Sequence, residues 1–143
     1  MTQTYHSLNT LCIRYNLSPN DILDGLFSTD MELCIHCKNL KTYFFDFTLI
    51  NEKTQQYAIK TLYLTGPFYL ATYDSCKILH QGTATVSKLK PQNYKFIAPA
   101  DTQQVSVKDL LFDEVNYQKF RTYLSEKQSF KTSFLPEQTL LGF

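Results

Sequence analysis

Apolar residues near the N-terminus recur at the spacing of two short amphipathic helices, separated by a break at Asn16-Leu17. Ser7 is a favoured N-cap for the first helix. The run Ser18-Pro19-Asn20-Asp21 predicts the second start, because Ser caps, Pro suits the first helical position and the acidic residue completes a capping box. The first apolar face is Leu8, Leu11, Cys12 and Tyr15. The second is Ile22, Leu23, Leu26 and Phe27.

Alternating apolar and polar residues after the second helix predict strands. The predicted strands are 31–38, 42–50, 56–64 and 83–89, with partly extended segments at 94–98 and 105–112. Asn39-Leu40-Lys41 and the polar run 51–54 are predicted turns, so that 42–50 and 56–64 form a hairpin. Gly66-Pro67 is expected to end this hairpin, and residues 68–70 can continue the sheet.

Two further helices are predicted, at 72–81 and 114–127. Thr72 and Gly82 would bound the first, and Asp113 would cap the second. The predicted inward positions are Tyr73, Cys76 and Leu79 or His80 on the first helix, and Tyr117, Phe120 and Leu124 on the second. Residues 128–143 give no firm element, but their apolar content indicates a tail that docks on the body or on a partner.

This order of elements predicts an α+β fold. A two-helix, helix-turn-helix-like unit (1–30) would pack on a mostly antiparallel sheet. The β-rich body (31–112) would carry the short middle helix, and 113–143 the longer helix and the apolar tail. A chain of 143 residues, 43% hydrophobic, is long enough to form one domain with its own core, so we expect a single domain over 1–143.

The cysteines and the apolar segments indicate in which cellular compartment the protein is expected. Four unevenly spaced cysteines do not resemble a secreted disulfide framework. The N-terminal residues lack the basic start and apolar run of a signal peptide, and polar residues interrupt every apolar segment before it reaches membrane length. We therefore expect a cytoplasmic protein with no membrane partner.

Charge is distributed unevenly along the chain. Residues 1–33 carry a net charge of −3, residues 34–100 a net charge of +5 and residues 101–143 a net charge of −1. In the basic middle, lysines are interleaved with tyrosines, a combination that can follow a nucleic-acid backbone and stack bases. The candidate lysines are Lys41, Lys60, Lys88, Lys90 and Lys95. The alternative is that the aromatic residues form the core and the lysines a solvated face that protects strand edges.

The two N-terminal helices suggest a second nucleic-acid surface, because the second helix of such a pair can enter a major groove. Arg14 and Asn20 are the candidate contacts. Asp21 and Asp24 lie on the same second helix, however, and their charge opposes docking on phosphate. The alternative is a two-helix cap that packs on the sheet.

The positions of the cysteines and histidines raise the hypothesis of a metal site. Cys34, Cys37, Cys76 and His80 would supply the four ligands of a tetrahedral zinc site. Alternation through 31–38 places Cys34 and Cys37 on opposite strand faces, however, and buried free cysteines behave as small apolar residues. We therefore expect no cofactor.

Enzymatic activity is not expected either. Cys34 with His36, or Cys76 with His80, pairs a thiol with an imidazole, but neither pair has an orienting carboxylate or an oxyanion device. The chain contains no G-x-G-x-x-G, P-loop, H-E-x-x-H or G-x-S-x-G motif.

Three segments, 7–9, 17–23 and 31–35, resemble the opening of small phage and prophage proteins with a MerR- or excisionase-type helix-turn-helix and a β-rich body. Segments 66–70 and 107–120 fit more loosely. The resemblance implies a non-enzymatic DNA-binding regulator or accessory factor, whose duplex binding should fall steeply with salt. The alternative is a protein–protein interaction factor, an inhibitor or adaptor, that uses the acidic helical end or the apolar tail 134–143. A zinc-stabilised module is the third hypothesis for this protein.

Overall fold

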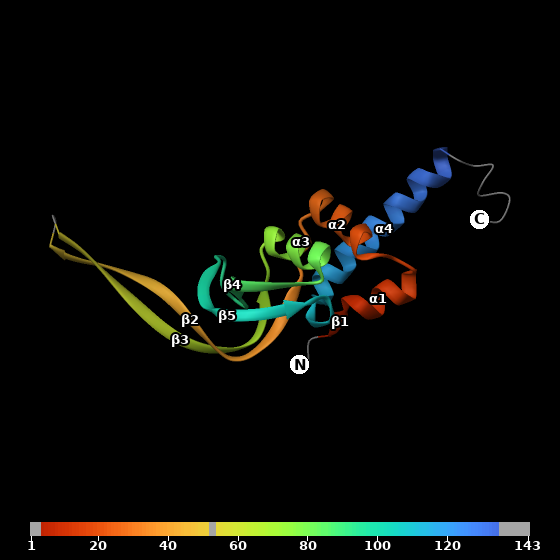
Figure 1. Cartoon of the computed structure of the whole chain (residues 1–143). Helices are drawn as coiled ribbons and strands as arrows, with labels where there is room; N and C mark the ends of the chain where they lie inside the picture. Colours follow the sequence, from red (N-terminus) through yellow and green to blue (C-terminus); the bar gives the residue numbers. More distant parts are fainter. Residues whose placement is uncertain (1–3, 52–53, 135–143) are drawn as a thin grey trace.

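The computed structural model describes residues 4–51 and 54–134, with side chains described for 4–44 and 60–127 (Figure 1). Its helices are α1 (Leu8–Tyr15), α2 (Pro19–Ser28), α3 (Thr72–Gln81) and α4 (Glu114–Phe134), with a 3-10 turn at Val107–Asp109. Its strands are β1 (Tyr5–Ser7), β2 (Cys34–Asn51), β3 (Thr54–Tyr69), β4 (Thr83–Pro91), β5 (Ala98–Ser106) and β6 (Leu111–Asp113). The mixed class predicted from the sequence is confirmed.

The strands form one sheet in the order β1-β6-β2-β3-β4-β5, and every pairing between described strands is antiparallel. A further pairing joins β2 to β5 at Thr42 and Ala100, so that β2, β3, β4 and β5 close into a four-stranded barrel. Closure pairs part of the β5 edge that an open sheet would leave exposed, whereas β1 pairs with β6 alone among the described strands. The sequence predicted hairpins but gave no indication of this closure.

The β2–β3 hairpin is much longer than the barrel and extends from it as a two-stranded arm (Figure 1). Two predicted interruptions of this hairpin are wrong. At Asn39-Leu40-Lys41 the chain does not turn. It forms a bulge, because Asn39 takes φ +55° and the register shifts between Cys37 and Leu40. Gly66-Pro67 does not end β3, which pairs with β2 as far as Tyr69.

The helix boundaries follow local chemistry. In α2 the Asp21 carboxylate accepts the backbone N–H of Ser18 at 2.8 Å, and Ile22 and Leu26 are buried as predicted. Phe27 is not in the core, since 73% of its side chain is exposed. In α1, Asn16 ends the helix in the left-handed conformation at φ +54°. The packing of α1 and α2 as one helix-turn-helix unit on the sheet remains a prediction.

Three predictions about α3 and α4 need correction. Ala71, not Thr72, is the N-cap of α3, although Gly82 ends it at φ +87°. The buried face of α3 is Ser75, Ile78 and Leu79, and Tyr73 and His80 are exposed. Helix α4 continues to Phe134, beyond the predicted end, and the remaining tail lies outside the described residues. The short strand β1 was not predicted, because three residues define a strand only through their pairing with β6.

A buried core joins the helices to the barrel. It combines Leu8 and Leu11 of α1, Phe68 of β3, Phe112 of β6 and Phe120 of α4, each with at most 1% of its surface exposed. The Phe112 and Phe120 rings stack with centroids 5.3 Å apart. Burial of this apolar surface holds the helices against one end of the barrel, opposite the arm (Figure 1).

Polar groups connect α4 to the strands at the same end. Asp113 accepts the backbone N–H of Asn116 at 2.8 Å, the predicted cap of α4, and a hydrogen bond from the Tyr69 phenol. Lys90 Nζ lies 2.8 Å from both carboxylate oxygens of Glu32, which belongs to the segment before β2. These contacts satisfy polar groups that would otherwise be costly to bury.

Candidate nucleic-acid interface

The residues predicted to contact nucleic acid do not form one surface. Arg14 on α1 and Asn20 on α2 are exposed among the helices, whereas the candidate lysines belong to the barrel strands and the β4–β5 connection. In Figure 1 the arm and α1 lie at opposite ends of the molecule. A single ligand contact that uses both groups is therefore not supported.

The exposed side of α2 is acidic. The helix contains no Lys or Arg. Its Asp24 lies 3.9 Å from Lys127 Nζ of α4, and Asp30 just beyond the helix lies 3.3 Å from Lys119 Nζ. These pairs are surface ion pairs that offset part of the acidic charge but leave no positive face for phosphate. Asn20 is the exposed polar group that remains near the start of the helix.

One of the candidate lysines is paired with a carboxylate. Lys90 makes the two-oxygen contact with Glu32, and its Nζ lies 5.5 Å from the centroid of the Tyr69 ring. Lys90 is thus part of the structural network. Burial raises the pKa of Asp74, and the charges of Lys77 and then Lys88 act in the opposite direction.

Lys41 lies on the outer face of the β2–β3 hairpin with Tyr43. The Lys41 Nζ is 5.5 Å from the Tyr43 ring centroid, and the Tyr43 hydroxyl donates a 2.6 Å hydrogen bond to Asp101. That bond raises the pKa of Tyr43. Tyr63 pairs with Lys41 across the hairpin and is 58% exposed. Asp101 reduces the positive potential of this face.

Three rings gather at the base of the arm, where β2 meets the β4–β5 connection. The Phe44 and Tyr94 rings stack with centroids 5.1 Å apart and planes at 28°. The Phe96 ring meets Phe44 edge-on at 5.8 Å and Tyr94 edge-on at 5.7 Å. Phe96 is 53% exposed, so the cluster is open to solvent on its Phe96 side. Aromatic pairs in such geometry stabilise one another and present a rigid apolar surface.

Two exposed lysines neighbour these rings, one on the strand ladder and one in the chain. Lys60 is the cross-strand partner of Phe44, and Lys95 lies between Tyr94 and Phe96 in the chain. Paired residues on an antiparallel ladder project to the same face, so Lys60 and Phe44 share a face of the hairpin. We call Phe44, Lys60, Tyr94, Lys95 and Phe96 the ring–lysine surface.

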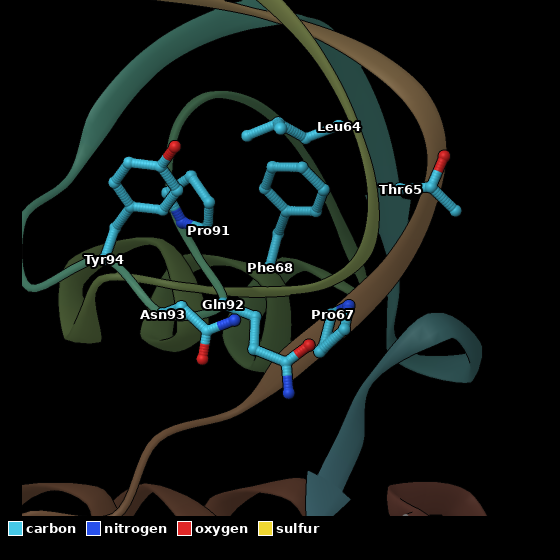
Figure 2. Close-up of a pocket in the computed structure, with 8 residues that line it drawn as sticks. All are labelled: Leu64, Thr65, Pro67, Phe68, Pro91, Gln92, Asn93 and Tyr94. Atoms are coloured by element: carbon cyan, nitrogen blue, oxygen red, sulfur yellow. The ribbon is translucent and has the colours of Figure 1, made fainter. Parts of the chain in front are cut away.

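A pocket of about 410 Å³ adjoins this surface (Figure 2). Tyr94 belongs to both, because its ring stacks on Phe44 and also lines the pocket. Figure 2 shows apolar side chains on the walls and the amides of Gln92 and Asn93 together at one rim. The lining residues are Leu64, Thr65, Pro67, Phe68, Pro91, Gln92, Asn93 and Tyr94.

Sequence reasoning found the lysines and Tyr94 but missed Phe44 and Phe96. Phe44 was expected to be an ordinary strand residue, and the run 94–98 was expected to be partly extended. The alternation of Tyr94, Lys95 and Phe96 after a Pro-Gln-Asn turn was the one available signal. Only the fold brings Phe44, fifty positions earlier, against this run.

The four proposed zinc ligands are not brought together. Cys34 and Cys37 lie on β2, and Cys76 and His80 lie on α3. Within the described residues, no group of three or more His, Cys, Asp or Glu side chains could hold a metal ion. Burial raises the pKa of Cys34 to about 12 and that of Cys37 to about 11, which disfavours the thiolates that a metal or nucleophilic catalysis requires.

Comparison with protein-family models, curated proteins and solved structures found no match to this chain. None of the helices in the described part of the chain combines the length and apolar character that a membrane crossing requires. The ring–lysine surface and the pocket beside it are the features of the molecule from which a function can be inferred.

Proposed function

We propose that this chain is a non-enzymatic protein that binds nucleic acid through the ring–lysine surface. The observation that carries the proposal is the partly exposed Phe96, held against Phe44 and Tyr94, whose neighbours include Lys60 and Lys95. Aromatic faces stack bases, and lysines beside them neutralise phosphates. A regulatory or accessory role of the phage type, which the resemblance of the N-terminal segments implies, is part of the same proposal.

The surface favours single-stranded nucleic acid over a duplex. Stacking on a protein ring needs a base that is free of its own stack, as it is in single strands, loops and ends. Helix α2, which would have to enter a major groove, has acidic residues where a groove reader needs donors to phosphate. The duplex contact implied by Arg14 and Asn20 is therefore the weaker form of the proposal.

Fluorescence anisotropy with labelled single-stranded and duplex oligonucleotides tests this proposal. We expect single-strand binding that Phe96→Ala weakens by about 5- to 150-fold, because loss of one base–ring stack costs about 1–3 kcal/mol. Lys60→Ala and Lys95→Ala should each reduce the slope of log K against log salt by about 0.7, since each lysine releases counterions from one phosphate.

Two variants serve as matched controls. Phe27→Ala removes an exposed ring from α2, and Lys108→Ala removes an exposed lysine outside the ring–lysine surface. Neither should change single-strand affinity. If no oligonucleotide binds at low salt, or if Phe27→Ala and Phe96→Ala weaken binding equally, the proposed surface is wrong.

A protein partner is the second candidate function, favoured by the exposure of Phe27. This ring occupies a position that the sequence assigns to the core, yet it is 73% exposed, and Ile13 of α1 is 83% exposed. Aromatic side chains are enriched in the cores of protein interfaces, and a contiguous exposed apolar patch marks such an interface. A second copy of the chain is the partner that sedimentation equilibrium tests most directly. Self-association that Phe27→Ser abolishes would support it, and a monomer at all concentrations would oppose it.

A further inference from the structure

We infer that the pocket beside Tyr94 holds a single nucleobase of the bound strand. This inference rests on the proposed function and deepens it, because it adds a site that distinguishes one base from another. The ring–lysine surface alone would stack any base. The pocket offers hydrogen-bonding groups that a stacking surface does not have.

The walls of the pocket suit a flat heterocycle. Phe68 is 1% exposed and fixed in the core, with half-buried Leu64 nearby (Figure 2). Tyr94 and the buried Pro91 add further apolar surface. The volume of about 410 Å³ lies at the small end of the range for small-molecule sites, roughly 300–1,000 Å³.

The rim supplies the polar groups that a base edge requires. Gln92 and Asn93 each carry a carbonyl acceptor and an amide donor. The Watson–Crick edge of every base also combines donors and acceptors, and amide side chains are well suited to pair with such an edge. A charged rim would instead favour a carboxylate or phosphate ligand, and the residues that line this pocket are all uncharged.

The backbone holds this rim in place. Tyr94 N–H donates to Pro91 O at 3.2 Å across the turn, and Asn93 takes φ +71°. Opposite the turn, Gly66 takes φ +138°, and the point where its Cβ would stand is 3.8 Å from Gln92 Oε1. The two exposed amides therefore project from a turn whose backbone is fixed by a hydrogen bond. Preorganisation of this kind reduces the entropy lost on binding.

Tyr94 links the pocket to the stacking surface. Because its ring packs on Phe44 and lines the pocket, a base stacked on the cluster has its neighbour at the pocket mouth. Lys95 follows Tyr94 directly in the chain and is exposed, so its ammonium is available to the phosphate between two such bases. The strand would thus contribute one base to the rings and one to the pocket.

The test uses free nucleosides and oligonucleotides with the full chain. Adenosine, cytidine, guanosine and uridine are titrated separately against ¹⁵N-labelled protein. We expect at least one to shift the side-chain amide signals of Gln92 and Asn93. Gln92→Met with Asn93→Gly removes both amides but keeps side-chain length at 92 and the left-handed conformation at 93. This double variant should lose nucleoside binding by about tenfold or more.

The matched control is Asn16→Gly, which replaces another left-handed Asn, at φ +54°, far along the chain from the pocket. It should retain the nucleoside shifts, and unchanged amide spectra elsewhere would show that the double variant is folded. The backbone amides of Thr65 and Tyr94, which line the pocket and remain in the double variant, provide the readout there. Nucleoside shifts of these signals that persist in the double variant, or no shift with any nucleoside, would overturn the inference.

Oligonucleotide binding separates the two proposals. If single strands bind and depend on Phe96, but the double variant and the wild type prefer the same bases to the same degree, the ring–lysine surface stands and the pocket assignment fails. If nucleosides shift the amides while no oligonucleotide binds, the pocket is a base site and the proposed strand-binding function fails.

Discussion

The side-chain oxygen of Asn116, in the first turn of α4, accepts a hydrogen bond from the backbone N–H of Glu32 at 2.7 Å. The amide nitrogen of the same side chain donates to Asp113 at 2.8 Å. Asn116 is 5% exposed, so both ends of its amide are satisfied inside the protein. The start of α4 is thereby fixed to the segment that leads into β2, eighty-four positions earlier in the chain.

Replacing Asn116 with Leu should destabilise the fold by about 2–4 kcal/mol. The change leaves the Glu32 N–H and one Asp113 oxygen without this partner, and each buried group left unpaired costs about 1–3 kcal/mol. Urea unfolding at neutral pH measures the effect. Ser125→Ala, at an exposed position of the same helix, should change stability by less than about 0.5 kcal/mol. A loss below about 1 kcal/mol for Asn116→Leu would show that water replaces the amide.

Elements decided by a few neighbouring residues could be predicted from the sequence. The Ser18–Asp21 contact and the Asp113 cap each lie within four residues, and the structure contains both. The inward positions Tyr117 and Phe120 were predicted from helical spacing, and both are buried. Local capping and periodicity set these features, whatever the rest of the chain does.

Features that depend on distant contacts could not be predicted. Barrel closure rests on one pairing between Thr42 and Ala100, and no local pattern marks either residue. The ring–lysine surface depends on the contact between Phe44 and Tyr94. The sequence pattern around each ring is equally compatible with two separate core residues. Phe27 has helical spacing appropriate for the core and is nevertheless exposed. Periodicity identifies an apolar face but does not show whether other elements are wide enough to cover all of it.

The bulge at Asn39 predicts which substitutions at this position lower the stability of the protein. Its φ of +55° is accessible to Gly at little cost, whereas a β-branched residue there is strained by about 1–2 kcal/mol. Asn39→Gly should therefore be nearly neutral and Asn39→Val destabilising by about that amount, as measured by thermal or urea unfolding. Thr61→Val, at an exposed regular strand position, is the control and should be neutral. Equal stability of the two Asn39 variants would contradict the left-handed bulge.

The contact between His6 and Glu114 predicts a dependence of stability on acid. His6 Nε2 lies 2.8 Å from Glu114 Oε2, and this bond, with a second from Gln118, lowers the pKa of Glu114 below its usual 4.5. A carboxylate with a lowered folded pKa contributes stability above its unfolded pKa, and that contribution is lost as pH falls through the folded value. As the pH falls below 5, the free energy of unfolding of Glu114→Gln should therefore decrease less than that of the wild type.

Urea unfolding over that acid range provides the measurement. Glu126→Gln, an exposed position on the same helix, should keep the wild-type profile. His6→Ala should resemble Glu114→Gln in its acid response, because it removes the main partner of the carboxylate. Parallel acid profiles for the wild type and Glu114→Gln would rule out a contribution from this contact.

The buried thiol of Cys34 predicts a loss of stability at alkaline pH. Burial, and then the charges of Asp113 and Glu32, raise the pKa of this thiol to about 12 from an ordinary value of 9.0. Because the folded pKa is higher than the unfolded one, the contribution is fully present below pH 9 and is lost as pH rises toward 12. Cys34→Ala removes this titration. Its free energy of unfolding should fall less steeply over that range, by up to about 1.4 kcal/mol per pH unit.

Thiol labelling gives an independent measurement of the same group. Cys34 is fully buried, so with a disulfide reagent at pH 8 it should react in the native protein only as fast as the protein unfolds. Cys76 is half-buried and serves as the comparison, because Cys76→Ala should remove a faster-reacting thiol. Rapid labelling of Cys34 in the folded protein, together with equal alkaline slopes for wild type and Cys34→Ala, would contradict the raised pKa. Slow labelling with a reduced slope in Cys34→Ala would establish Cys34 as a protonated core residue, which is incompatible with a zinc ligand or a nucleophile at that position.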